Sequence, residues 1–185
     1  MSDASPVIHG RCHVFGHDMG MDTEVLPHAY AQLYPFDAEK LKHHLFERVR
    51  EGFAAQCRPG DIIVAGRNFA HGKPHPQALI AIAELGLHVL CESMPFYAYR
   101  GAISRGVLIH RDCAGVTDMV ADGDIASHDF STGAFHNETN GKSANFSPLP
   151  ERLLDMIQIG GMKPMLAQWR KAQLHQHDTA NTKGD

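Results

Sequence analysis

The stretch GRNFAHGKPHPQA, residues 66–78, holds two histidines and a lysine whose side chains could do chemistry. It brings His71, Lys73 and His75 close together along the chain. An imidazole or a neutral amine can take up a proton, and the charged forms of both can contact a carboxylate. The stretch therefore predicts either acid–base chemistry or the binding of an organic anion.

Metal binding is the other chemistry that two nearby histidines suggest. His71 and His75 have the i, i+4 spacing that places two imidazoles on one face of a helix. Pro74 and Pro76 disfavour a helix through this pair. We therefore expect solvated histidines here and no metal ion bound by this chain.

The neighbouring segments place this stretch at one edge of a sheet. The apolar run Asp61–Ala65 predicts a buried strand before it, and Pro76–Leu85 predicts a helix after it. Beyond that helix the chain gives a strand at Leu87–Ser93, a helix at Met94–Gly106 and a strand at Val107–His110. This alternation predicts an α/β fold with a mostly parallel central sheet, whose ligands bind beyond the carboxyl ends of the strands.

Segments on the N-terminal side extend this core. Gly10–Gly16 predicts a further strand. Residues 37–56 predict one long helix that begins at an N-cap Asp37, because an apolar residue recurs at every fourth position. Those recurring residues are Leu41, Leu45, Val49 and Phe53.

The C-terminal part has a different pattern. Turn signals at Asp122-Gly123, Thr132-Gly133 and Asn140-Gly141 predict a small antiparallel addition. Two helices separated by Gly160-Gly161 follow. The tail, residues 175–185, is polar and we expect it to be disordered, which makes residues 1–174 one domain.

Composition limits the class of protein. The chain has 185 residues and a net charge of −4, which does not favour binding to nucleic acid. It has no signal-peptide pattern and no apolar run long enough to span a membrane, so we expect a cytoplasmic protein. Its four cysteines contain no CxxC pair, so we expect no zinc or iron–sulfur cofactor held by this chain.

Four stretches, in order along the chain, together resemble the small subunit of 3-isopropylmalate dehydratase, the swivelling-domain part of the aconitase superfamily. They are GRCHVFGHDMGMDTEVLP, DIIVAGRNF, ESMPFYAYRGAISRGVLIH and IQIGGMKPML. The resemblance implies a β/β/α swivelling domain and a separate large subunit that carries a [4Fe–4S] cluster. It also implies a heterodimer that dehydrates or isomerises a small hydroxy acid, in which the small subunit supplies the base and groups that bind carboxylates.

The loop itself departs from the family pattern, G-x-N-F-G-[CS]-G-S-S-R-E-H-A. Lys73 stands where the family has its serine base, and His75 stands where it has an arginine that clamps a carboxylate. We favour catalysis with substituted groups, in which partial burial and His71 or His75 favour the neutral Lys73 amine. In a second interpretation Lys73 and His75 only bind anions at a helix N-terminus, and Asp22 or the large subunit is the base. In a third, the subunit is a non-catalytic scaffold or regulator.

Other candidate residues follow from the same resemblance. Asp22, Thr23 and Glu24 occupy the family's D-T-D position, where the first carboxylate orients substrate or water. Alternatively, Asp22 and Thr23 only cap a turn. His28 lies where a family loop meets the variable side group of the substrate, and Arg100 matches an arginine of the family's F-x-R-N pattern. The sequence therefore predicts Lys73, Asp22 and His71 as catalytic residues, and His75, Thr23, Glu24, His28 and Arg100 as substrate-binding residues.

Overall fold

The computed structural model describes residues 6–181 except 32–34 and 36, and its core is one seven-stranded mixed sheet. The strand order is β4-β3-β2-β1-β5-β6-β7. Four strands pair in parallel: β1 (Val7–Phe15), β2 (Ile62–Ala65), β3 (His88–Cys91) and β4 (Ile109–His110). Three extend the sheet in antiparallel fashion from β1: β5 (Ile125–Asp129), β6 (Ala134–Asn137) and β7 (Ser143–Asn145).

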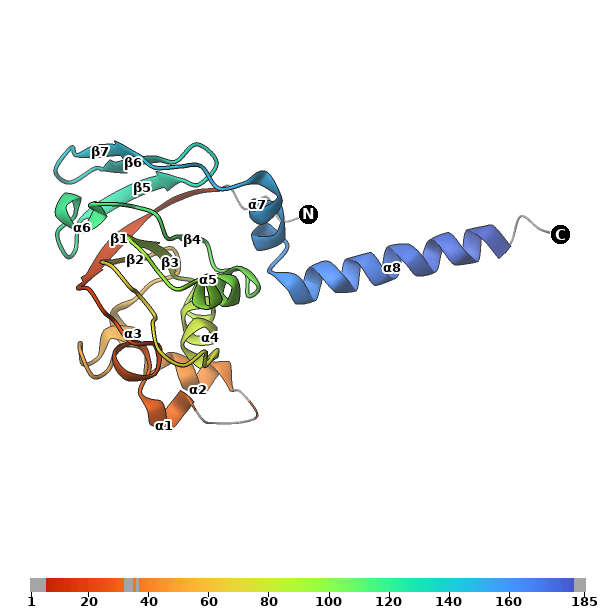
Figure 1. The fold of residues 1–185 in the computed structure, drawn as a ribbon, viewed down its shortest axis with the longest axis horizontal. Coiled ribbons are helices and arrows are strands. Elements are labelled where there is room, and N and C mark those ends of the chain that lie inside the picture. The colour runs from red at the N-terminus through yellow and green to blue at the C-terminus, as the bar shows by residue number, and fades with distance from the viewer. Residues whose placement is uncertain (1–5, 32–34, 36, 182–185) are drawn as a thin grey trace.

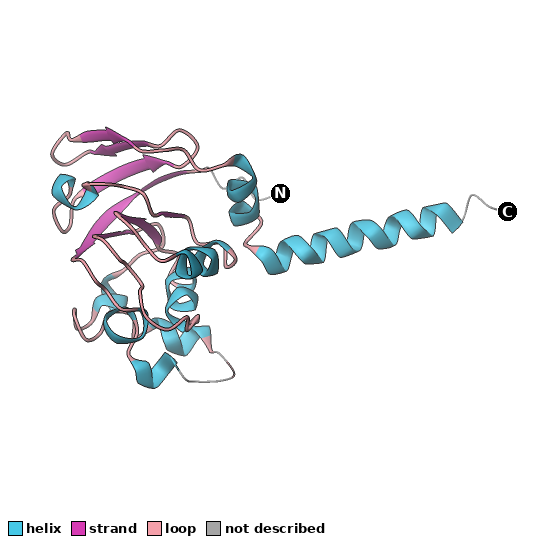
Figure 2. Ribbon diagram, in the orientation of Figure 1, coloured by secondary structure: helices cyan, strands magenta, loops and turns pink. Residues whose placement is uncertain are grey.

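The helices gather mainly on the side of the parallel strands (Figures 1 and 2). Two of them are the predicted crossover helices, α4 (Gln77–Glu84) and α5 (Phe96–Ile103). The shorter ones are α1 (His28–Ala31), α2 (Ala38–Lys42), α3 (Phe53–Gln56) and α6 (Val116–Met119). One more helical turn, η1, spans Met21–Val25. The antiparallel strands, the parallel strands and these helices give the β/β/α arrangement expected from the sequence.

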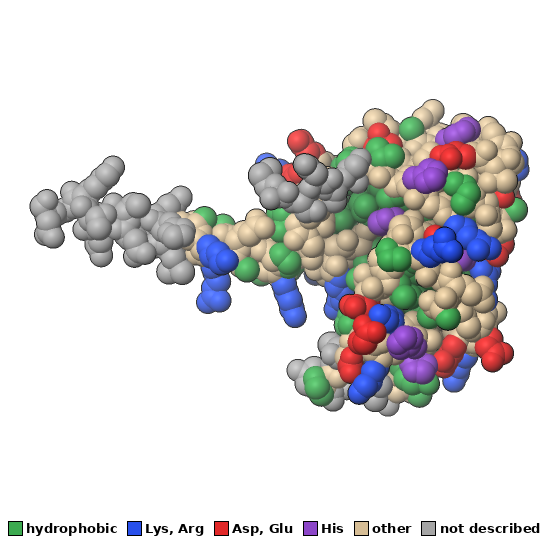
Figure 3. Space-filling model, turned by 180° about the vertical axis from the view of Figure 1, so that it is seen from behind, with side chains coloured by type: hydrophobic (Ala, Val, Ile, Leu, Met, Phe, Trp, Pro, Cys, Tyr) green, Lys and Arg blue, Asp and Glu red, His purple; other side chains and the backbone are tan. Residues whose placement is uncertain are grey.

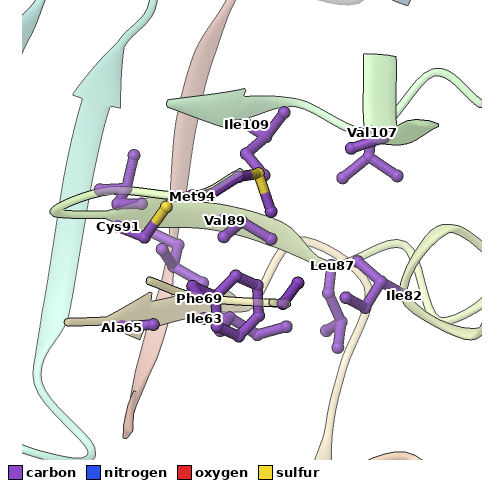
Figure 4. Close-up of a cluster of buried hydrophobic side chains, with 14 of the residues drawn as sticks. Ile63, Ala65, Phe69, Ile82, Leu87, Val89, Cys91, Met94, Val107 and Ile109 are labelled. Carbon is purple, nitrogen blue, oxygen red and sulfur yellow. The ribbon is translucent and has the colours of Figure 1, made fainter. Parts of the chain in front are cut away.

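Buried apolar side chains hold the parallel strands and helices together (Figure 4). All four residues of β2 are buried, as expected for a parallel strand that is covered on both faces. Ile63 from β2 lies beside Phe69, and Val89 from β3 and Ile82 from α4 belong to the same buried cluster. This core fixes the end of β2, and with it the start of the loop that carries His71, Lys73 and His75.

The prediction of one continuous helix over residues 37–56 was wrong, because the chain forms two short helices, α2 and α3, with turns between them. Asp37 does cap a helix, because its side chain accepts the Lys40 N–H, but α2 ends at Lys42. Phe46 adopts a left-handed backbone with φ 56°, stacks on Phe15 with ring centroids 4.0 Å apart, and donates its N–H to Val25. Tertiary packing of this aromatic ring therefore overrides the helical periodicity.

The antiparallel addition forms as its turn signals predicted. Gly133 lies in the turn between β5 and β6 with φ 80°, and a Cβ there would come within 1.9 Å of the Phe146 carbonyl oxygen. Only glycine fits this turn, since other residues would meet both the strained backbone and the clash. Gly123 and Gly141, in the other two predicted turns, also have positive φ.

The chain ends in α7 (Glu151–Gln158) and α8 (Met162–Asn181), separated by the predicted glycine pair. Figures 1 and 3 show α8 projecting away from the body of the molecule. The helix continues into the tail that we expected to be disordered, and residues 182–185 lie outside the described residues. The domain boundary at residue 174 stays a prediction. No described helix is both long and apolar enough to cross a membrane.

Candidate active site

The loop after β2 is anchored by its own backbone and by the end of β3. Asn68 and Ala70 both have left-handed backbones, with φ of 59° and 57°. Between them, the buried Phe69 donates its N–H to the Ser93 carbonyl at 2.9 Å, and the Asn68 N–H bonds the Ser93 hydroxyl at 2.9 Å. These contacts hold the loop in one conformation before it reaches His71.

The same loop is bonded to the segment that follows β1. The Met21 N–H donates to the His71 carbonyl at 2.7 Å, and His71 Nε2 lies 3.1 Å from the Asp18 carbonyl oxygen. Asn68 donates to Asp18 Oδ1 at 2.9 Å, and the Arg67 N–H donates to a ring nitrogen of His17 at 2.8 Å. His71, predicted as catalytic, therefore takes part in joining the two segments.

Three of the predicted residues meet where these segments join. Asp22 Oδ2 lies 3.2 Å from His28 Nδ1 and 3.4 Å from His75 Nδ1. The Asp22 side chain is only 15% exposed, against 29% for His75 and 46% for His28. We call Asp22, His28 and His75 the edge cluster, because Asp22 and His75 follow the carboxyl ends of β1 and β2.

A cavity of about 240 Å³ lies beside the edge cluster. His75 lines it together with Tyr97 and Arg105 of the α5 region, and its walls also include Pro74, Pro76 and Leu79. Tyr97 donates its hydroxyl to the Gly72 carbonyl at 2.5 Å, which ties α5 to the loop.

Arg105 and Tyr97 were missed by sequence reasoning. Burial lowers the pKa of the Arg105 guanidinium below its ordinary value, and its Nη1 donates to the Gly101 carbonyl at 2.8 Å. Burial raises the pKa of the Tyr97 hydroxyl. The signal that could have found them is their spacing, since residues 97, 101 and 105 lie at helical intervals of four and share one face.

Gly101 explains how α5 comes so close to α4. A Cβ at this position would lie 2.8 Å from Cδ1 of Leu79, a residue of α4. The family pattern has asparagine here, and an asparagine would require the Leu79 side chain to shift. Glycine therefore allows the present shape of the cavity wall.

The exposure of Lys73 differs from the partial burial that was expected from the sequence. Its side chain is exposed, so the partial burial that was to favour a neutral amine is not provided by the described part of this chain. Among the described residues, the cavity is lined by its neighbours Pro74 and His75 and not by Lys73 itself. Any desolvation of Lys73 must come from a partner that covers the loop.

Thr23 and Glu24 hold a turn, whereas the simpler interpretation of this position assigned that role to Asp22 and Thr23. The Glu24 carboxylate accepts hydrogen bonds from the Gly20 N–H at 2.8 Å and from the Thr23 hydroxyl. These bonds, the one from Thr23 first, lower the pKa of Glu24. Arg100 is exposed and lies over the Phe96 ring, 5.7 Å from its centroid, rather than at the cavity.

The cysteines belong to the core rather than to this site. Cys12, Cys91 and Cys113 are buried, and Cys57 is half-buried. Burial raises the pKa of Cys12 and of Cys57 to about 12, so both thiols are neutral near pH 7. A neutral buried thiol is a poor metal ligand, because metals bind the thiolate.

These features define an α/β domain that gathers histidine, aspartate and lysine side chains beyond the carboxyl ends of its parallel strands. The cavity there is small and bordered by an arginine and an imidazole. A site of this size and charge suits a small organic anion. The fold and the site therefore define a class of protein: a domain that binds a small ligand and places acid–base side chains beside it.

Relatives identify the family. The chain is 34% identical to the 3-isopropylmalate dehydratase small subunit of Nautilia profundicola over 157 residues, which cover 84% of this chain and 92% of that one. It is also 34% identical to the methanogen homoaconitase small subunit of Methanothermobacter thermautotrophicus, over 84% of this chain and 88% of that one. No protein-family model matches the chain.

A solved structure agrees with this likeness. The 3-isopropylmalate dehydratase structure from Methanocaldococcus jannaschii superposes with a TM-score of 0.81 at 28% identity, and covers 92% of this chain and 99% of that one. The chain belongs to the family of 3-isopropylmalate dehydratase small subunits, which are components of aconitase-like hydro-lyases. The resemblance and the fold class inferred from the sequence are confirmed.

Proposed function

We propose that this chain is the small subunit of a two-subunit hydro-lyase that dehydrates or isomerises a hydroxy di- or tricarboxylic acid. The observation that carries the proposal is the junction of the loop after β2 with the segment after β1. It places Asp22 and His75 3.4 Å apart, beside a cavity bordered by Arg105. The relatives include both 3-isopropylmalate dehydratase and homoaconitase small subunits, so we name the class of acid and leave its variable side group open.

The cavity suits the carboxylate end of such a substrate. Arg105 carries a positive charge, and His75 can donate a hydrogen bond or carry a charge of its own. A volume of about 240 Å³ is below the range of sites for drug-sized ligands, and therefore favours a small acid. His75 and Arg105 would together do the work of the arginine that the family loop normally supplies.

Lys73 is our candidate for the base. In the proposed step its amine removes a proton from the carbon next to a substrate carboxylate, the C–H electrons form the new double bond, and the hydroxyl leaves from the neighbouring carbon. The [4Fe–4S] cluster expected on the large subunit would supply Lewis-acid assistance to that leaving hydroxyl. Because Lys73 is exposed in this chain, the step requires the large subunit to cover the loop and exclude water.

A second function, that of a non-catalytic scaffold or regulatory subunit, is favoured by one observation. Lys73 is exposed and stands apart from the cavity that His75 lines. In that case the edge cluster would bind an anion or orient the large subunit, and the base would lie on the partner.

Turnover by the assembled pair tests the proposal. The chain is co-purified with a cluster-bearing large subunit from the same genome and screened against malate, citrate and their homologues by ultraviolet absorbance of the unsaturated acid. We expect turnover of at least one acid, and a loss in kcat on the order of 10²–10⁴-fold for Lys73→Ala. Lys40→Ala, at a side chain 80% exposed on α2, is the matched control. If Lys73→Ala turns over substrate as fast as the control, the amine is not the base and the scaffold function is favoured. If the pair turns over no hydroxy acid, the hydro-lyase proposal is contradicted.

A further inference from the structure

The edge cluster has the donor set of a metal site. Asp22, His28 and His75 each offer one ligand atom, and these atoms all lie within 4.8 Å of one another. In both imidazoles Nδ1 is the ring atom close to the same carboxylate oxygen, Asp22 Oδ2. Two histidines and one carboxylate are a common set of protein ligands for zinc, with further positions left open.

The distances within the cluster match those around a small ion. Ligands held 2.0–2.2 Å from a tetrahedral ion lie about 3.3–3.6 Å from one another. Here the carboxylate oxygen lies 3.2 Å from one ring nitrogen and 3.4 Å from the other. Two of the three distances between ligand atoms therefore already suit an ion, and the third, between the two imidazoles, is within 4.8 Å.

Hydrogen bonding alone does not satisfy the cluster. His75 Nδ1 is buried, and among the described residues it has no hydrogen-bond partner, although Asp22 Oδ2 is only 3.4 Å away. The distance allows an ion pair, but the direction does not make a hydrogen bond. A buried polar atom without a partner is destabilising, and a bound ion would satisfy it.

The backbone holds the three ligands in place without the ion. Asp22 has a non-helical backbone within η1, with φ −110° and ψ 22°, and His28 opens α1. His75 stands between Pro74 and Pro76, which restrict its backbone, and its N–H bonds the Lys73 carbonyl at 2.8 Å. Pro74 and Pro76, which disfavour a helix through His71 and His75, thus restrict the backbone of one ligand of this different set, His75.

We infer that Asp22, His28 and His75 form a three-ligand site for a divalent transition metal ion of the zinc type. His75 also lines the cavity, so the open coordination position lies on the cavity side. Its proposed use rests on the function proposed above. In that use the ion held by His75 acts together with Arg105 to hold the substrate carboxylate.

A second group of possible ligands, His13, Cys57 and Asp61, is less suited to an ion. His13 Nε2 lies 3.0 Å from Asp61 Oδ2, and the same oxygen accepts the Arg58 N–H at 3.0 Å. The pKa of the Cys57 thiol is raised to about 12 by burial, so the thiolate is disfavoured. This group serves as the internal control for the test.

Metal binding by the full chain, without the large subunit, tests the inference. Metal-free protein is titrated with Zn²⁺ by calorimetry, and Co²⁺ is used to read the coordination from its visible spectrum. We expect one ion per chain with a four- or five-coordinate Co²⁺ spectrum. Asp22→Asn, His28→Gln and His75→Gln should each lower the affinity at least about 100-fold, since even outer partners of metal ligands contribute 10–100-fold.

Matched controls locate the ion. His43→Gln removes an exposed histidine, 64% accessible, and should bind Zn²⁺ like the parent chain. Cys57→Ser removes a ligand of the second group, and a His175→Gln/His177→Gln double variant removes two tail histidines. Both should also keep full binding.

Two results would overturn the inference. One is the absence of saturable Zn²⁺ binding by a folded parent chain, and the other is Zn²⁺ binding that survives the three edge-cluster substitutions, whether or not Cys57→Ser or the tail variant loses it. Circular dichroism melting verifies that each variant is folded. Failure of the proposed hydro-lyase function would give a different result. The pair with the large subunit would be inactive, while the small subunit would still bind one Zn²⁺ ion at the edge cluster.

Discussion

Two histidine clusters in this fold have opposite surroundings. His110 of β4 and His128 of β5 are buried, and their ring nitrogens lie 3.0 Å apart. His128 packs edge-on against Phe130 with ring centroids 4.6 Å apart. In the edge cluster, His28 and His75 face a carboxylate and remain partly exposed.

The comparison shows how surroundings decide what a histidine does. Burial, followed by the neighbouring His110, lowers the pKa of His128 to about 4, so the buried pair is neutral near pH 7 and can only act as a hydrogen-bonded part of the core. The edge cluster keeps a negative charge, solvent access and a cavity beside it. The first cluster should therefore contribute to stability, and the second to ligand chemistry.

The largest expected effect is a loss of unfolding free energy at acid pH, caused by the buried cluster of His110 and His128. A histidine whose pKa is lowered by folding is neutral in the native state and takes up a proton on unfolding, so stability falls as the pH drops. For His128 the loss lies between its ordinary pKa of 6.5 and its folded value of about 4, and is on the order of 3 kcal/mol. Urea unfolding across this pH range should show the decline, and His128→Phe should reduce its slope.

The contrast for this experiment is an exposed histidine. His9, whose side chain is 62% exposed beside Glu138, should leave the pH dependence unchanged when replaced by glutamine. If the unfolding free energy of the parent chain does not change between the two pKa values, burial does not lower the pKa of His128, and this account of the buried pair is wrong.

A smaller loss of stability is expected at the buried end of β6. Asn137 is fully buried, donates to Asp124 Oδ2 at 2.6 Å and to the Met119 carbonyl at 2.9 Å, and accepts the Thr139 N–H. Asn137→Ala removes the acceptor of the Thr139 and Asn140 N–H groups, while Asp124 Oδ2 and the Met119 carbonyl keep their hydrogen bonds from Asn140. The loss should cost about 2 kcal/mol of unfolding free energy. The exposed Asn145 of β7 provides the control, and equal melting curves for the two variants would contradict this account.

The edge cluster should have the smallest effect on stability. Its pairs are partly exposed, and such pairs contribute little. Asp22→Asn, His28→Gln and His75→Gln, measured without added metal, should each change the unfolding free energy by less than about 1 kcal/mol. A loss comparable to that of Asn137→Ala would mean that the edge cluster is chiefly structural.

The sequence predicted much of the parallel core because its signals are local. The apolar run that became β2 and the positive-φ glycines of the turns each act within a few residues. The helix over residues 37–56 failed because Phe46 turned into the core against Phe15, a contact between distant parts of the chain. Periodicity cannot register such a contact.

The candidate site was predictable as a list of residues and not as an arrangement. The family likeness singled out Asp22, His28 and His75 separately, but only the pairing of β1 with β2 brings them together. The family likeness could not show that the Lys73 side chain is exposed in this chain. Arg105 was missed because it falls at a variable position of the family pattern, and its role depends on how α5 packs against the loop.

Turnover by variants of each cluster, measured side by side, tests the central contrast most directly. In the purified pair with its large subunit, Asp22→Asn should lower kcat/KM on the order of 100-fold while the small subunit keeps its melting temperature. His128→Phe should keep a kcat/KM near that of the parent pair and alter only the pH dependence of unfolding. Full turnover in Asp22→Asn, with activity lost in a folded His128→Phe, would contradict the assignment of function to the edge cluster.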